Sequence, residues 1–123
     1  MSKLLEILAQ DTLEVKTQAV FIFSNMTENG NPQQLYPYFR EVGLIRYYAR
    51  LLKERDHTLL SNTLEALYQL FQFGEQFREN KENMFVFEFM TEQVVEELEN
   101  LQSHSVQEIS KKAYLLLAAF FKL

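Results

Sequence analysis

The chain contains no cysteine, and among its 123 residues there are only three glycines and two prolines. The absence of cysteine excludes a disulfide-bonded scaffold and a cysteine-ligated metal or iron–sulfur centre. The scarcity of glycine excludes a collagen-like repeat. No run approaches the roughly 18 apolar residues of a membrane-spanning helix, and the N-terminal residues lack the apolar core and cleavage site of a signal peptide. We therefore expect an intracellular protein without a membrane partner.

The composition is that of a folded domain with an uneven charge. Apolar residues make up 47% of the chain and charged residues 24%, as in ordinary globular proteins. The formal net charge of −5 argues against nucleic acid as a partner. Residues 75–108 carry nine acidic and two basic side chains. Such a segment can attract a basic peptide, or it can simply form solvated helix faces.

The sequence marks the starts of several helices. Asp11 and Asn31, the latter followed by a proline, are candidate N-cap residues, and Ser105 with Glu108 has the spacing of a capping box. The run MFVFEFM at 84–90 has the composition of a strand, but it lacks flanking turn signals and we assign it to a helix. We expect helices at 3–9, 13–28, 32–41, 44–53, 57–73, 79–90, 92–101 and 106–121.

The helical pattern repeats along the chain. The segment LLEILAQDTLEVKTQAVFIFSN aligns with YARLLKERDHTLLSNTLEALYQ at an offset of 44 residues, and LENLQSHSVQEISKKAYLLLAAF follows about 50 residues later. A short helix, a turn and a longer helix on this period are typical of armadillo and HEAT repeats. The segment QQLYPYFREVG supplies a third helix per repeat, which favours armadillo. We predict an all-α, right-handed superhelical armadillo solenoid of about three repeats, the first incomplete.

This prediction divides one array into three parts. Residues 1–30 form the end of one repeat, 31–76 the second repeat, and 77–123 the last, capping repeat. In a solenoid each repeat covers only its neighbours. If earlier repeats are missing, the apolar side chains near the N-terminus lose their cover, and we expect self-association through that end. These side chains are Leu4, Leu5, Ile7 and Leu8.

Several segments resemble importin alpha. KTQAVFIFSNMTENGNPQQLYPYFREVGLI is similar to the repeat pattern of that family, TLEALYQLFQFGE to its ninth repeat, and VVEELENLQSHSVQEISKKAYLLLAAFF to its tenth and last. The resemblance spans nearly the whole chain. It implies the C-terminal armadillo repeats of a nuclear import adaptor that works in the cytoplasm and the nucleus. The departures are Phe21 in place of a Trp, Thr91-Glu92 near the place of a Gly, and Ser110 in place of a Tyr.

One helix face of the first copy carries a candidate peptide-binding site. Phe21 and Asn25 are four residues apart and share this face with Gln18 and Glu28. An Asn amide donates and accepts hydrogen bonds and can hold an extended peptide backbone, while an aromatic ring can flank a lysine. In importin alpha, a Trp-and-Asn ladder binds nuclear localisation signals, and the resemblance implies that this repeat contributes to the minor site. The alternative is that Phe21 is a core residue and Asn25 a local cap.

The equivalent face of the second copy carries Asn62, Glu65 and Gln69. A Glu in place of the aromatic residue removes the slot for a lysine stem and keeps an anion. We therefore expect the groove to weaken after the first copy, with Asn25 more important for binding than Gln69.

The last helix is a candidate contact for a transport partner. The resemblance implies that the export receptor called CAS, or a nucleoporin, contacts the C-terminal repeats, and the matching residues are Ile109, Lys112, Ala113 and Tyr114. The alternative is a helix that only caps the solenoid.

No catalytic or metal-binding pattern stands out. His57 and His104 are far apart in the sequence and have no metal-ligand spacing, and the carboxylates of 92–99 read as a solvated helix face. We expect no enzyme, cofactor or metal. The predicted function is a nuclear import adaptor fragment that binds basic nuclear-localisation peptides. The alternative is a divergent armadillo or HEAT scaffold without nuclear-signal binding.

Overall fold

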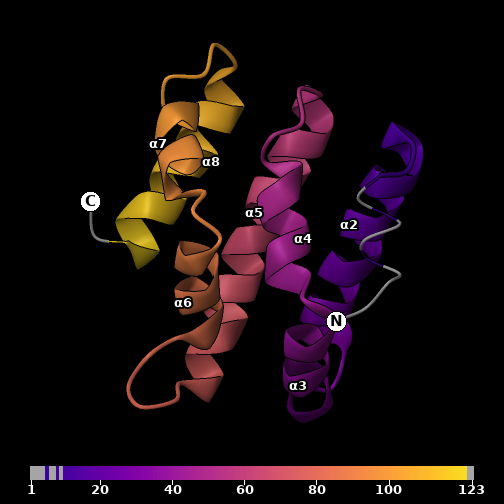
Figure 1. The fold of residues 1–123 in the computed structure, drawn as a ribbon, viewed down its shortest axis with the longest axis vertical. Helices are drawn as coiled ribbons and strands as arrows, with labels where there is room; N and C mark the ends of the chain where they lie inside the picture. The colour runs from indigo at the N-terminus through magenta and orange to yellow at the C-terminus, as the bar shows by residue number, and fades with distance from the viewer. Residues whose placement is uncertain (1–4, 6–7, 9, 122–123) are drawn as a thin grey trace.

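The computed structural model describes Leu5, Leu8 and residues 10–121. This part of the chain is all-helical, as predicted, and contains no β-strand (Figure 1). The predicted helix at 3–9 lies outside the described residues except for Leu5 and Leu8. The elements are α2 (Leu13–Asn29), α3 (Pro32–Val42), α4 (Leu44–Leu51), α5 (His57–Gly74), the short 3-10 helix η1 (Glu75–Phe77), α6 (Met84–Thr91), α7 (Val95–Leu101) and α8 (Gln107–Phe120).

The helix predicted at 79–90 begins later than expected, at Met84. Asn80 and Lys81 have left-handed backbone angles, with φ of 53° and 66°, and a right-handed helix cannot pass through them. Glu79 and Glu82 exchange backbone hydrogen bonds of 2.9 Å in both directions, which closes a tight turn. The aromatic run that follows is helical, as predicted.

The N-caps confirm one prediction and correct two. The Asn31 side chain accepts from the backbone N–H groups of the two residues after the proline, as expected. At the start of α2 the cap is Thr12, one residue after Asp11. The capping box predicted at Ser105 does not form, because His104 Nδ1 accepts from the backbone N–H of Val106 at 3.0 Å and Val106 becomes the N-cap without a side-chain bond.

The helices form two layers. The long helices α2, α5 and α8 lie side by side, and the shorter helices α4 and α7 lie in front of them (Figure 1). Helix α5 is central, because it packs against α2 on one side and α8 on the other as well as against α4 and α6. The short helices also contact each other, through α4 and α6.

The core is centred on α5. Its side chains Leu59, Leu64, Leu67 and Leu70 are completely buried. Phe71 meets three aromatic rings from other elements, those of Phe89, Phe120 and Phe121, at 5.2–6.0 Å between ring centroids. An apolar helix that is covered on several sides is expected to be the most stable element of such a stack.

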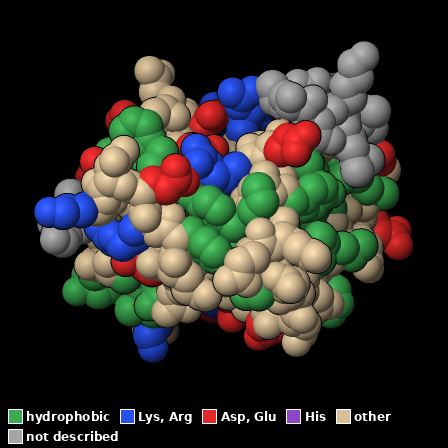
Figure 2. Space-filling model, turned by 90° about the horizontal axis from the view of Figure 1, so that it is seen from below, with side chains coloured by type: hydrophobic (Ala, Val, Ile, Leu, Met, Phe, Trp, Pro, Cys, Tyr) green, Lys and Arg blue, Asp and Glu red, His purple; other side chains and the backbone are tan. Residues whose placement is uncertain are grey.

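Ion pairs connect consecutive parts of the chain. Arg40 pairs with Glu79 at 2.8 Å and Glu88 at 3.1 Å, and Arg46 pairs with Glu92 at 3.4 Å. Lys53 lies 3.6 Å from Glu97, and Lys16 lies 2.8 Å from Glu54. Seen from below, Lys and Arg side chains lie beside Asp and Glu side chains (Figure 2). Much of the acidic excess of 75–108 is therefore paired with basic residues of the preceding segment.

Candidate functional site

The residues predicted to bind a peptide lie on α2 and α5. Gln18, Phe21, Asn25, Glu28 and Glu65 are exposed, and Asn62 and Gln69 are half-buried. The Phe21 side chain is 63% exposed, so the alternative that Phe21 belongs to the core is wrong. These positions are on the surface, but the structure does not bring all of them together.

A polar hollow of about 300 Å³ lies between α2 and α5. Three glutamine amides and one carboxylate line it, so it offers several donors and acceptors and one negative charge. We call it the glutamine hollow. Its lining residues are Thr27, Glu28, Gln69, Gln72, Phe73 and Gln76.

A second hollow of about 270 Å³ lies between α5 and α8. We call it the lysine hollow, because the Nζ atom of Lys112 donates to the Ser61 hydroxyl at 2.7 Å and lies 3.8 Å from Glu65. Lys112 is also 3.4 Å from Glu108. The protein thus supplies its own cation beside Glu65. The lining residues are Leu64, Glu65, Tyr68, Gln69, Lys112 and Leu115.

Gln69 lines both hollows. The Ser24 hydroxyl of α2 donates to its Oε1 atom, which orients the carboxamide and joins α2 to α5. Gln69 therefore occupies the junction of the two hollows, which the sequence alone did not indicate.

Four of the predicted residues line neither hollow. Phe21, Asn25 and Asn62 lie outside both, and Gln18 lines a separate, mainly apolar hollow of about 350 Å³ on α2. We therefore expect Glu28 and Gln69 to contribute more to peptide binding than the pair Phe21 and Asn25.

Sequence reasoning missed Gln72 and Gln76. Together with Gln69 they follow the spacing of one helix face, at i, i+3 and i+7. This stripe of amides was visible in YQLFQFGEQ and could have been found by asking which polar residues of the second copy share a face.

The predicted partner contact on α8 needs correction. Ile109 and Ala113 are completely buried in the core, so they are not available to a partner. Their positions belong to the apolar stripe of α8, which packs against α5 and α7. Lys112 is half-buried and bonded within the chain, and only Tyr114, at 57% exposure, presents most of its side chain on the surface.

A further hollow, of about 530 Å³, lies where the end of α5, the loop before α6, α6 itself and α8 meet. Asn83 donates from its amide to the Phe71 carbonyl and to Glu75 Oε2, both at 2.7 Å. The bond from Asn83 lowers the pKa of Glu75, and Arg78 lies 2.8 Å from the same carboxylate. The charges of Glu75 and Arg78 thus compensate each other.

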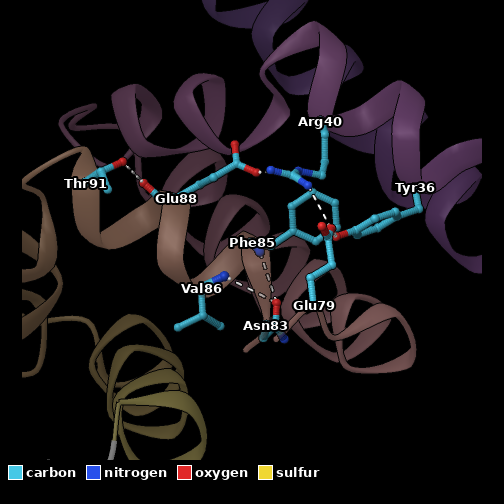
Figure 3. A network of polar contacts seen from close by, with 8 residues as sticks. All are labelled: Tyr36, Arg40, Glu79, Asn83, Phe85, Val86, Glu88 and Thr91. Carbon is cyan, nitrogen blue, oxygen red and sulfur yellow. Dashed lines mark hydrogen bonds and ion pairs between the residues drawn. The ribbon is translucent and has the colours of Figure 1, made fainter. Parts of the chain in front are cut away.

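A further polar network joins α3 to α6 (Figure 3). Arg40 lies between Glu79 and Glu88, and the Tyr36 hydroxyl donates to Glu79 Oε2 at 2.5 Å. Burial raises the pKa of Tyr36 to about 12 and also raises the pKa of Glu88. These groups bond to one another and line none of the four hollows. The network is best understood as a structural joint.

The two histidines come together in space. The rings of His57 and His104 are 5.1 Å apart and perpendicular, although the residues are far apart in the sequence. Within the described residues, no group of three His, Cys, Asp or Glu side chains is placed to hold a metal ion. Among the helices described, none combines the length and the apolar character that crossing a membrane requires.

The described part of the chain is thus all-helical, with two hollows between its long helices that share Gln69. No protein-family model and no curated protein matches the sequence.

Proposed function

We propose that this chain is a peptide-binding module of the armadillo type, similar to the C-terminal repeats of importin alpha, and that it binds basic nuclear-localisation peptides in transport between the cytoplasm and the nucleus. The observation that carries the proposal is the meeting of the glutamine and lysine hollows at Gln69, between helices that repeat along the chain.

The order of the helices supports an armadillo arrangement. Helices α3, α4 and α5 are followed by α6, α7 and α8, and in each set the last helix is the longest. The long helices begin at Leu13, His57 and Gln107 and stack in that order. The apolar stripes of α5 and α8 are buried by neighbouring helices, as in a solenoid.

The glutamine hollow suits an extended peptide. Its amides can both donate to and accept from peptide N–H and C=O groups without reading the peptide sequence. Glu28 supplies an anion for a lysine or arginine, and the exposed ring of Phe21 lies on the same helix. Because few such groups are present, the affinity should be weak. We expect a Kd of tens of micromolar, on the order of 6 kcal/mol.

Titration of a lysine-rich peptide tests the proposal. Glu28→Gln is expected to weaken binding about fivefold through the lost charge. Gln69→Ala is expected to weaken it about tenfold, and Asn25→Ala less, because Asn25 lines neither hollow. Glu41→Gln on α3 is the charge-matched control and should leave binding unchanged. Equal binding by wild type, Glu28→Gln and Gln69→Ala would show that the peptide does not bind at the hollows that Glu28 and Gln69 line.

The second candidate is an interaction scaffold that binds no nuclear signal. It is favoured by the position of Lys112 beside Glu65 and by the ion pairs that Glu88 of α6 and Glu97 of α7 form within the chain. A scaffold predicts no measurable binding of the lysine-rich peptide even at millimolar concentration, with unchanged folding.

A further inference from the structure

Equivalent positions of the long helices face equivalent neighbours. Ser61, the fifth residue of α5, accepts from Lys112, the sixth residue of α8. Ser24, the twelfth residue of α2, bonds to Gln69, the thirteenth residue of α5. Positions five, eight and twelve share one helix face, and positions six, ten and thirteen share another. The first face therefore looks toward the following long helix and the second toward the preceding one.

The face toward the following helix is covered on α2 and α5 but not on α8. The eighth residues Val20 and Leu64 are 1% and 0% exposed, whereas Tyr114, the eighth residue of α8, is 57% exposed. Lys111 and Ala118, at positions five and twelve of α8, are exposed as well. The equivalent faces of α2 and α5 pack against the next long helix, whereas this face of α8 has no neighbour within the described residues.

At its tenth position, the face toward the preceding helix is covered on α5 and α8 but not on α2. The tenth residues Ala66 and Leu116 are 3% and 0% exposed, whereas Ile22, the tenth residue of α2, is 54% exposed. Beside Ile22 is the hollow of about 350 Å³, whose lining also includes Leu8 and Val15.

We infer that a second copy of this chain covers these surfaces, with α8 of one copy stacked on α2 of the next as α8 stacks on α5 within the chain. The open hollow at Ile22 lies where the ring of Tyr114 would pack. Within the chain, position five of one long helix meets position six of the next, and position twelve meets position thirteen. The same register between two copies places Lys111 opposite Gln18 and Ala118 opposite Asn25. The exposed Glu14 at the hollow and Lys111 on the other face carry opposite charges.

This association is heterologous, because two different surfaces meet. A heterologous contact that does not close into a ring grows into longer assemblies, whereas two copies of one surface would stop at a dimer. The inference is independent of whether the groove binds a peptide.

Sedimentation velocity over a range of concentrations tests the inference. Wild type should form species larger than a dimer as its concentration rises. Ile22→Glu and Tyr114→Glu should each weaken association at least about tenfold, because each puts a charge at the centre of one surface. Tyr38→Glu, which alters an exposed tyrosine of α3 that lies on neither surface, should associate like wild type.

Mixing the two variants gives the sharpest result. Each retains the surface that the other has lost, so an equimolar mixture should form a dimer and nothing larger. A wild type that is monomeric at all concentrations would overturn the inference. So would single variants that still dimerise, or a mixture that stays monomeric while wild type associates.

Cross-linking tests the register without a destabilising charge. Because the chain has no cysteine, Asn25→Cys and Ala118→Cys proteins can be mixed and oxidised, and they should form a disulfide-linked dimer. Lys111→Cys, about 10 Å from position 118 along α8, is the matched control and should not link to Asn25→Cys. Equal cross-linking of both pairs, or linking of neither, would contradict the proposed stacking.

Discussion

At the scale of single residues, Tyr47 and Tyr48 of α4 each bury a polar hydroxyl group in the apolar core. Their side chains are 2% and 1% exposed, and neither hydroxyl has a hydrogen-bond partner among the described residues. Burial raises the pKa of Tyr47 to about 12 and raises the pKa of Tyr48 further. The rings contribute to the core, while a buried hydroxyl without a partner lowers stability.

Replacing either tyrosine with phenylalanine should therefore stabilise the protein. Tyr47→Phe and Tyr48→Phe are each expected to raise the free energy of unfolding by about 1 kcal/mol, because they remove a desolvated hydroxyl and keep the ring. Urea denaturation followed by circular dichroism measures the change. Tyr114→Phe, at an exposed hydroxyl, should change nothing. A loss of stability in both core variants would show that the hydroxyls have partners after all.

Two tyrosines with raised pKa values predict how the stability of the protein changes at high pH. Tyr36 and Tyr47 have folded-state pKa values raised from 10.0 to about 12. The unfolded chain therefore releases these protons first, so the stability they contribute is fully present below pH 10.0 and is lost as the pH rises toward about 12. Denaturation curves over this range should show a smaller loss in the double variant Tyr36→Phe/Tyr47→Phe than in wild type. An identical loss in both proteins would rule out these groups as the cause.

At the scale of elements, the segment before α6 shows how a buried cap starts a helix. Asn83 is 7% exposed, and its Oδ1 atom accepts from the backbone N–H groups of Phe85 and Val86 (Figure 3). Its amide also bonds to the Phe71 carbonyl of α5. The packing is tight, because a Cβ atom added at Gly74 would lie 2.5 Å from Asn83 Oδ1. One side chain therefore starts α6 and ties it to α5.

Asn83→Ala should be much more destabilising than the loss of an ordinary cap. We expect a loss of about 3 kcal/mol, because the substitution removes the cap and leaves a buried carbonyl without its donor. Asn31→Ala, at the exposed cap of α3, is the matched control and should lower the free energy of unfolding by about 1 kcal/mol. Thermal and urea unfolding of the two variants give the comparison. Equal losses would mean that the buried bonds of Asn83 add nothing.

At the scale of the whole molecule, α5 holds the two layers together. It contacts α2, α4, α6 and α8, and most of its apolar side chains are buried. The ion pairs around it connect basic residues of one segment to acidic residues of the next, as Arg40 and Glu88 do. The stack therefore depends on contacts between consecutive segments.

Hydrogen exchange should rank the helices accordingly. The amides of α5 should exchange slowest, through global unfolding, while the seven-residue α7, whose N-cap makes no side-chain bond, should open locally and exchange faster. Leu67→Ala, at a fully buried site of α5, should lower stability by about 2–5 kcal/mol, and Leu13→Ala, at a 45% exposed site, by less than about 1 kcal/mol. Uniform exchange rates across the helices would contradict a central role for α5.

The sequence by itself determined the helices, because their causes are local. Apolar spacing and the cap at Asn31 predict α2, α3 and α5 to within a few residues, and the polar face of α2 correctly placed Phe21 on the surface. Only the tertiary structure decided which residues meet. The burial of Ile109, the ion pair of Lys112 with Glu65 and the place of Gln69 between two hollows all depend on distances between segments some 50 residues apart. Those distances are set by how the long helices pack, and helical periodicity does not encode them.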